Sequence, residues 1–151
     1  MKVPLVDLEC QFRIIQKEIK EAVEKVLASG RYILGPNVKA LEDEIASYCG
    51  TSYGIGVASG TDALRLSLLA VGVGEKDEVI TTPFTFVATA QVISQVGATP
   101  IFVDIDEKTF NIDVNKIERA ITSRTKAIIP VHLFGHPVDM RNILNIAKEH
   151  N

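Results

Sequence analysis

The stretch YGIGVASGTDALRLSLL, residues 53–69, contains the change of pattern that decides the fold. A short apolar run at residues 54–58 leads into the small residues Ala58 to Gly60, and leucines at helical spacing follow. A strand that passes through a tight turn into a helix is typical of one βα unit. We therefore predict a strand over residues 54–58 and a helix over residues 62–71.

The alternation of strand and helix continues in the rest of the chain. Further strands are predicted at residues 78–81, 100–103 and 127–131, and further helices at 85–95, 114–122 and 140–150. The runs Val79-Ile80 and Ile128-Ile129 are apolar without alternation, as expected when both faces of a strand are buried. Two earlier helices are predicted at residues 11–28 and 38–48, and each is followed by a glycine. The pattern predicts an α/β fold with four parallel strands flanked by helices.

Composition excludes several classes of partner. The chain has 151 residues and a formal net charge of −3, and its lysines and arginines form no block that could neutralise a run of phosphates. We therefore expect no nucleic acid partner. No window approaches 18 consecutive apolar residues, and Asp7 and Glu9 interrupt the N-terminal apolar stretch, so we expect neither a membrane span nor a signal peptide. The expected location is the cytoplasm.

The predicted turn at residues 58–62 has the features of an anion site. Free amides at a helix N-terminus and the helix dipole both favour a phosphate group. Gly60 would let the backbone approach the phosphate closely, and the Thr61 hydroxyl could donate one more hydrogen bond. Asp62 would contribute its backbone amide, because its carboxylate would repel an anion. The alternative is that Ser59, Thr61 or Asp62 simply caps the helix, since these residue types are common there.

Three competing motifs are weaker. Gly54-Ile-Gly56 begins like a dinucleotide-binding fingerprint, but Ser59 stands where the third glycine is needed. His132 and His136 have a spacing that binds zinc on a helix, yet Gly135 and Pro137 make a helix unfavourable there. The pair Asp104 and Asp106 is interpreted as part of an ordinary polar turn.

Several longer segments resemble one known family. The segment VASGTDALRLSLLAVGVGEKDEVITTPFTFVATA is similar to the corresponding part of the DegT/DnrJ/EryC1/StrS family of sugar aminotransferases. Four further segments resemble the same family in the same order: VPLVDLECQF, GRYILGPNVKALEDEIASYCG, PIFVDIDEKTFNID and AIIPVHLFGHPVDM. The resemblance covers essentially the whole chain, and the order of the motifs makes it more specific than any one of them.

The resemblance implies a fold, a cofactor and a reaction. It implies the aspartate-aminotransferase-like fold (fold type I), with residues 1–151 as the N-terminal part of the large domain that binds pyridoxal 5'-phosphate between two subunits of a homodimer. Gly60, Thr61 and Asp62 would hold the phosphate, and Phe86 would stack on the pyridine ring. The alternative for Phe86 is a core aromatic on a helix face. The implied reaction moves an amino group, usually from glutamate, onto a nucleotide-linked keto sugar, in polysaccharide or glycoside biosynthesis.

The lysine and aspartate that this chemistry needs have no match in the chain. Transamination requires a lysine amine and a carboxylate against the pyridine nitrogen, and in the family both lie beyond the position that corresponds to Asn151. We therefore expect these 151 residues alone to be inactive and to supply no catalytic residue. Two alternatives stay open at this point: a sugar dehydratase that uses the same cofactor, and a non-catalytic protein that binds a partner.

Overall fold

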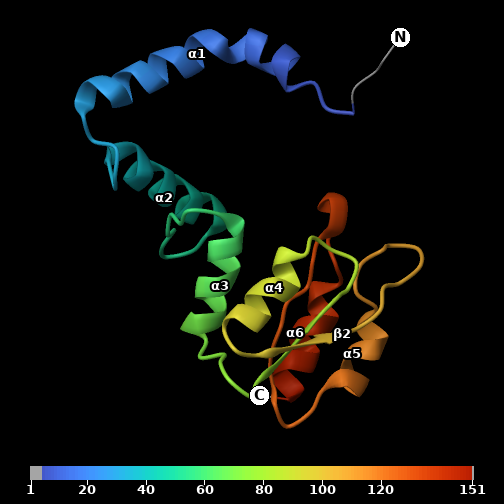
Figure 1. The fold of residues 1–151 in the computed structure, drawn as a ribbon. Helices are drawn as coiled ribbons and strands as arrows, with labels where there is room; N and C mark the ends of the chain where they lie inside the picture. Colours follow the sequence, from blue (N-terminus) through green and yellow to red (C-terminus); the bar gives the residue numbers. More distant parts are fainter. Residues whose placement is uncertain (1–4, 151) are drawn as a thin grey trace. The chain divides into compact units, whose positions relative to one another are not determined.

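The computed structural model describes residues 5–150, and these residues form two compact units. The first unit ends at Gly56 and the second begins at Val57. The prediction that residues 1–151 form part of one larger domain stays a prediction. Figure 1 shows the elements of both units.

The first unit contains two helices, α1 (Leu8–Ser29) and α2 (Pro36–Cys49), close to the predicted ranges. The Asp7 carboxylate caps α1 by accepting from the amide of Cys10 at 2.9 Å. Gly30 and Gly50 end the two helices with φ of +66° each, a conformation that favours glycine. No residue of α1 is buried, so the helix contributes nothing to a core within the described residues.

The strand predicted over residues 54–58 is absent, and this prediction was wrong. No strand pairs with these residues in the described part of the chain, and the Ile55 side chain is exposed. Residues 54–56 lie against α2 instead: the Gly56 amide donates to Glu42 Oε1 at 2.8 Å. A Cβ atom on Gly54 would come within 2.4 Å of the Glu42 carbonyl oxygen. A strand needs a neighbour to bond its backbone, and this segment bonds a side chain instead.

The second unit is built on a parallel sheet of β1 (Glu78–Thr81), β2 (Thr99–Phe102) and β3 (Thr125–Ile128). Their order is β2-β1-β3, and Ile80 pairs with Ile101 on one side and Ile128 on the other. These strands confirm three of the four predicted ones, with shifts of a few residues at their ends. The helices of the unit are α3 (Gly60–Ala70), α4 (Ala88–Gln95), α5 (Val114–Ala120) and α6 (Met140–Glu149).

Helices cover both faces of this sheet. The chain moves one way across the sheet from β1 to β2 and the other way from β2 to β3, so right-handed crossovers place α4 and α5 on opposite faces. Val79 faces the α3 and α4 side, while its neighbour Ile80 faces the α5 and α6 side, and neither has any exposed surface. The predicted burial of β1 on both faces and the α/β class are confirmed.

The edge at which the parallel strands begin, the amino edge, holds a buried and paired carboxylate. Glu78 begins β1 with only 4% of its surface exposed, and its carboxylate accepts hydrogen bonds from the Thr122 hydroxyl and the Arg124 guanidinium. The Arg124 carbonyl in turn accepts from the Glu78 amide at 2.8 Å. The Thr122 hydrogen bond, and after it the Arg124 contact, lowers the pKa of Glu78 below its ordinary value. The buried charge at the start of β1 therefore has both its partners in the segment before β3.

Candidate functional site

The candidate site lies at the carboxyl edge of the sheet. Helices α3 and α4 both run antiparallel to β1, so both begin at the edge where the parallel strands end (Figure 1). The pairing continues just past the strands, where the Val103 amide bonds the Thr81 carbonyl and the Ile129 amide bonds the Ile80 carbonyl. Ligands of open α/β sheets bind outside the carboxyl ends of the strands.

The first turn of α3 leaves two amides without an acceptor. The Ser59 hydroxyl accepts from the Asp62 amide at 3.1 Å, and the Ser59 carbonyl accepts from the Ala63 amide at 2.9 Å. The amides of Gly60 and Thr61 precede any position that can bond within the helix, and no other acceptor for them exists in the described residues. Among the three residues proposed as caps, Ser59 is the one that caps.

Space is open above this turn. A Cβ atom built on Gly60 would have no neighbour within 4 Å, and the φ of Gly60 lies outside the left-handed region. Neither the backbone conformation nor the packing of this chain requires glycine there. The glycine therefore keeps clear a space that a side chain would fill, directly beside the two free amides. An anion such as a phosphate fits this arrangement.

Asp62 is placed differently from its two neighbours. Its amide, which we expected to bind phosphate, is engaged by the Ser59 cap. Its carboxylate lies 3.6 Å from the Arg65 guanidinium, one helical turn along. The structure thus brings Gly60 and Thr61 together as free donors, and gives Asp62 a role in the cap and in an ion pair.

Phe86 lies before α4 and not within it, because the helix begins at Ala88 and not at Thr85 as predicted. Pro83 lacks an amide hydrogen, and the Thr82 hydroxyl accepts from the Phe84 amide at 3.2 Å, so residues 83–85 form a bend. The Phe86 side chain is 75% exposed, so within the described residues it is not the core aromatic of the alternative interpretation. Phe84, the neighbouring aromatic, packs on Phe110 with 6.0 Å between ring centroids. Phe86 is thus the aromatic of this bend with a free face.

Sequence reasoning missed the role of Asn111. Asp113 caps α5 by accepting from the Asn115 amide. Asn111 itself is 3% exposed and bonds a distant turn: its Nδ2 donates to the His136 carbonyl at 2.9 Å, and its Oδ1 accepts from the Leu133 amide at 3.1 Å. Only the unusual burial of an asparagine could have signalled this, and burial is not visible in the sequence.

The histidine pair lies in that same turn, whose centre is the short 3₁₀ helix η1 (Leu133–Gly135). His132 uses its ring nitrogen Nδ1 to accept from the Val138 amide at 3.1 Å. The other weak motif also has a structural role, since the Asp106 carboxylate organises its own turn by accepting from the Thr109 amide and hydroxyl and from the Lys108 amide. These bonds, the Thr109 amide first, lower the pKa of Asp106.

Comparison with known proteins places the chain in a family. Residues 13–151 match the profile of the DegT/DnrJ/EryC1/StrS aminotransferase family. A pleiotropic regulatory protein of Geobacillus stearothermophilus is 52% identical over 150 residues, which are 99% of this chain and 40% of that protein. UDP-N-acetyl-3-dehydro-alpha-D-glucosamine 3-aminotransferase of Acidithiobacillus ferrooxidans is 49% identical over 148 residues, 98% of this chain and 40% of that enzyme.

The fold is shared with solved structures. The crystal structure of NtdA from Bacillus subtilis with bound cofactor PMP superposes with a TM-score of 0.95 at 39% identity, over 99% of this chain and 34% of that one. The chain thus spans about two fifths or less of the length of these relatives. Within residues 5–150, no helix has both the length and the apolarity to cross a membrane. The predicted partial fold type I domain is confirmed, and the chain belongs to the DegT/DnrJ/EryC1/StrS aminotransferase family.

Proposed function

We propose that the protein containing this chain is a pyridoxal 5'-phosphate-dependent aminotransferase that acts on a nucleotide-linked keto sugar. One observation carries the proposal: at the carboxyl edge of the sheet, the amides of Gly60 and Thr61 have no acceptor in the described residues, and a Cβ atom on Gly60 would meet open space. Membership of an aminotransferase family and the PMP in the NtdA structure support it. Residues 1–151 are then the N-terminal part of the cofactor-binding large domain.

The residues of this chain fit the cofactor in two respects. The amides of Gly60 and Thr61, with the Thr61 hydroxyl, would donate to the phosphate, and the N-terminal end of the α3 dipole favours its charge. The free face of Phe86 would cover the pyridine ring and keep it in plane. When bound, the cofactor supplies an electron sink for the chemistry at the amino-bearing carbon. The Asp62 amide would contribute indirectly, because it donates to the Ser59 hydroxyl and so keeps the first turn of α3 capped.

The substrates follow from the relatives. The name of the Acidithiobacillus enzyme describes a UDP-linked dehydro sugar as substrate, and we propose the same class here, with glutamate as amino donor. We further propose a cytoplasmic homodimer and a role in polysaccharide or glycoside biosynthesis. The lysine that bonds the cofactor is expected outside residues 1–151, so these residues alone would not transaminate.

Expression of the whole reading frame tests the proposal. The purified protein should show a visible absorbance that borohydride abolishes, and it should convert glutamate to 2-oxoglutarate only when a keto sugar nucleotide is present. A protein that binds no pyridoxal phosphate would contradict the proposal. Loss of water from the sugar without consumption of glutamate would instead favour the dehydratase.

A second candidate function has one specific observation in its favour. The Geobacillus relative carries the name of a pleiotropic regulatory protein, although it is 52% identical over nearly all of this chain. A non-catalytic regulator would bind the cofactor or a partner without turnover. Glutamate consumption in the assay above separates it from the enzyme.

A further inference from the structure

The turn that follows β3 holds an aromatic residue in an unusual conformation. Phe134, in the middle of η1, has φ of +51° and ψ of 26°, in the left-handed region that residues with a Cβ atom seldom adopt. Its side chain is 90% exposed, although burial of an aromatic ring would lower the free energy of the folded protein. Both features are unfavourable for the isolated chain, and both occur at one residue.

The surrounding structure actively holds this conformation. Asn111 bonds both sides of the turn, through the Leu133 amide and the His136 carbonyl. The His132 ring accepts from the Val138 amide, and the Gly135 amide donates to the His132 carbonyl at 3.1 Å. The side-chain amide of buried Asn111 bonds both sides of the turn and so fixes it in place. The turn therefore holds Phe134 in its exposed position. Strain that the surrounding structure maintains is a feature of functional sites.

The position of the turn connects it with the candidate site. Phe134 follows β3 at the carboxyl edge, the same edge at which α3 and α4 begin, and Figure 1 shows the orange-red turn at that end of the second unit. The phosphate donors and a stacking ring at this edge are already assigned to the first turn of α3 and to Phe86. Phe134 is therefore a second aromatic ring at the same edge with no partner in the described residues.

We propose that Phe134 is a specificity-determining residue whose ring binds the flat, CH-bearing face of the nucleotide-sugar substrate, and that Asn111 positions it. The inference rests on the proposed function and names one contact of that same site. An aromatic ring suits such a ligand because stacking on a base or on the carbon face of a sugar needs only a flat apolar surface, held rigidly.

The test uses the positive φ of Phe134. Glycine adopts a positive φ without a Cβ penalty, so Phe134→Gly should raise the melting temperature of the full-length protein while it weakens substrate binding. Titration calorimetry with UDP-N-acetylglucosamine and with dTDP-glucose measures that binding. We expect the dissociation constant of whichever sugar nucleotide the parent binds to rise about tenfold. Phe134→Tyr, which keeps the ring, should bind within about twofold of the parent.

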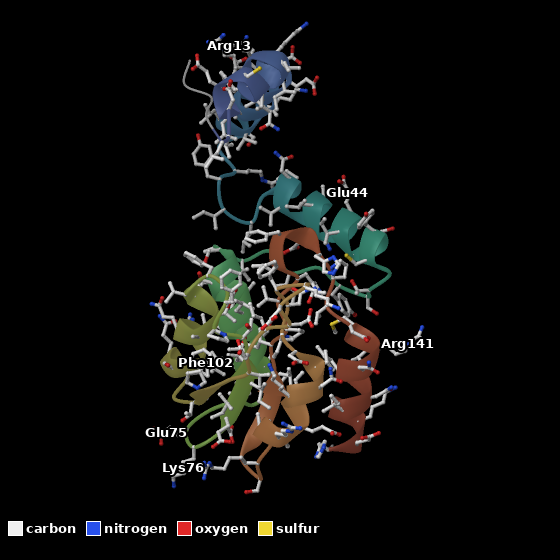
Figure 2. All side chains as sticks on the ribbon, turned by 90° about the vertical axis from the view of Figure 1, so that its right-hand side faces the viewer. Arg13, Glu44, Glu75, Lys76, Phe102 and Arg141 are labelled. Atoms are coloured by element: carbon white, nitrogen blue, oxygen red, sulfur yellow. The ribbon has the colours of Figure 1, made fainter. Side chains whose placement is uncertain are left out.

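A matched control lies at the other end of the sheet. Lys76 also has a positive φ, +72°, and is exposed, but it precedes β1 at the amino edge, and Figure 2 shows it at the opposite end of the unit from η1. Lys76→Gly should raise the melting temperature and leave the dissociation constant unchanged. Titration with UDP or dTDP alone then distinguishes the two halves of the ligand: an equal loss for the free nucleotide assigns the ring to the base, and a loss for the sugar nucleotide alone assigns it to the sugar.

Three outcomes would overturn the inference. Phe134→Gly could leave the dissociation constant unchanged, Phe134→Tyr could lose as much affinity as the glycine variant, or Phe134→Gly could dissociate an oligomer without changing substrate affinity. The last result would assign the ring to a protein contact. Failure of the proposed function is separate, because it would appear in the parent protein as the absence of bound cofactor and of any sugar-nucleotide binding.

Discussion

The two edges of the same three-stranded sheet differ in how their polar groups are satisfied. At the amino edge, the Glu78 carboxylate is almost fully buried and accepts from both Thr122 and Arg124. At the carboxyl edge, the amides of Gly60 and Thr61 have no acceptor in the described residues, and the rings of Phe86 and Phe134 are exposed.

This difference separates stability from binding. A buried charge must be paired or it destabilises the fold, so the amino edge is closed by its own side chains. Free donors and exposed rings contribute nothing to stability, yet they are what a phosphate and a flat ligand need. Substitutions of Glu78 or its partners should therefore change stability, and loss of a free donor or an exposed ring at the carboxyl edge should change binding. Two residues at the carboxyl edge should change stability instead: Ser59, which caps α3, and Asn111, whose two hydrogen bonds clamp the turn after β3.

The clamp is expected to give the largest effect. Asn111→Ala would remove two hydrogen bonds that cross more than twenty residues of sequence and would leave the Leu133 amide without its acceptor. We expect the free energy of unfolding to fall by about 2 kcal/mol. Denaturant titration measures this, with Asn115→Ala as a control because Asn115 is exposed and bonds only its own helix cap. Equal small losses for both variants would contradict the clamp.

The next effect concerns the phosphate donors. Gly60→Ala would place a methyl group in the open space beside the amides, and the backbone there can accept it without strain. Retention of pyridoxal phosphate by the full-length protein should fall about tenfold, the loss of one charge-assisted hydrogen bond, while the melting temperature stays level or rises slightly. Cofactor dissociation followed by absorbance tests this.

Thr61→Ala tests whether the Thr61 hydroxyl also binds the phosphate. Because Ser59 caps the helix, the Thr61 hydroxyl is free to bind, and its loss should weaken cofactor retention more than it lowers the melting temperature. If retention is unchanged while the melting temperature falls, Thr61 has only a structural role.

Ser59→Ala should behave in the opposite way. It removes the side chain that accepts from the Asp62 amide, and such caps contribute about 1 kcal/mol. The free energy of unfolding should fall by that amount. The freed Asp62 amide adds a donor at the phosphate site, so cofactor retention should be maintained. A loss of retention larger than that of Thr61→Ala would contradict the assignment of Ser59 to the cap and Thr61 to the phosphate.

The smallest effect is a pH dependence at the amino edge. The hydrogen bond from Thr122, with Arg124, holds the pKa of Glu78 below its ordinary value, so its contribution to stability is present above that ordinary value, about 4.3, and is lost as the pH falls toward the lower folded pKa. The stability difference between the parent and Glu78→Gln should therefore shrink as the pH falls below about 4.3. A difference that stays constant with pH would contradict the pairing.

Much of this arrangement could be predicted from local sequence. The unbroken apolar runs at Val79 and Ile128 indicated buried strands, and the small residues before Thr61 indicated a helix start that could accept an anion. These features depend on a few neighbouring residues, which is why they were visible.

The features that were missed depend on distant partners. Residues 54–58 have the pattern of a strand, but no other strand in the described residues bonds them, and the Gly56 amide binds Glu42 instead. The Asn111 clamp joins residues more than twenty positions apart. A local pattern gives the preference of a segment, and the tertiary partners decide whether that preference is realised.

A crystal structure of the full-length protein with pyridoxal phosphate would test the central claim most directly. We predict phosphate oxygens within hydrogen-bond distance of the amide nitrogens of Gly60 and Thr61, with the Ser59 to Asp62 cap intact. A phosphate bound at another edge of the sheet, or side chains filling the space above Gly60, would contradict the account.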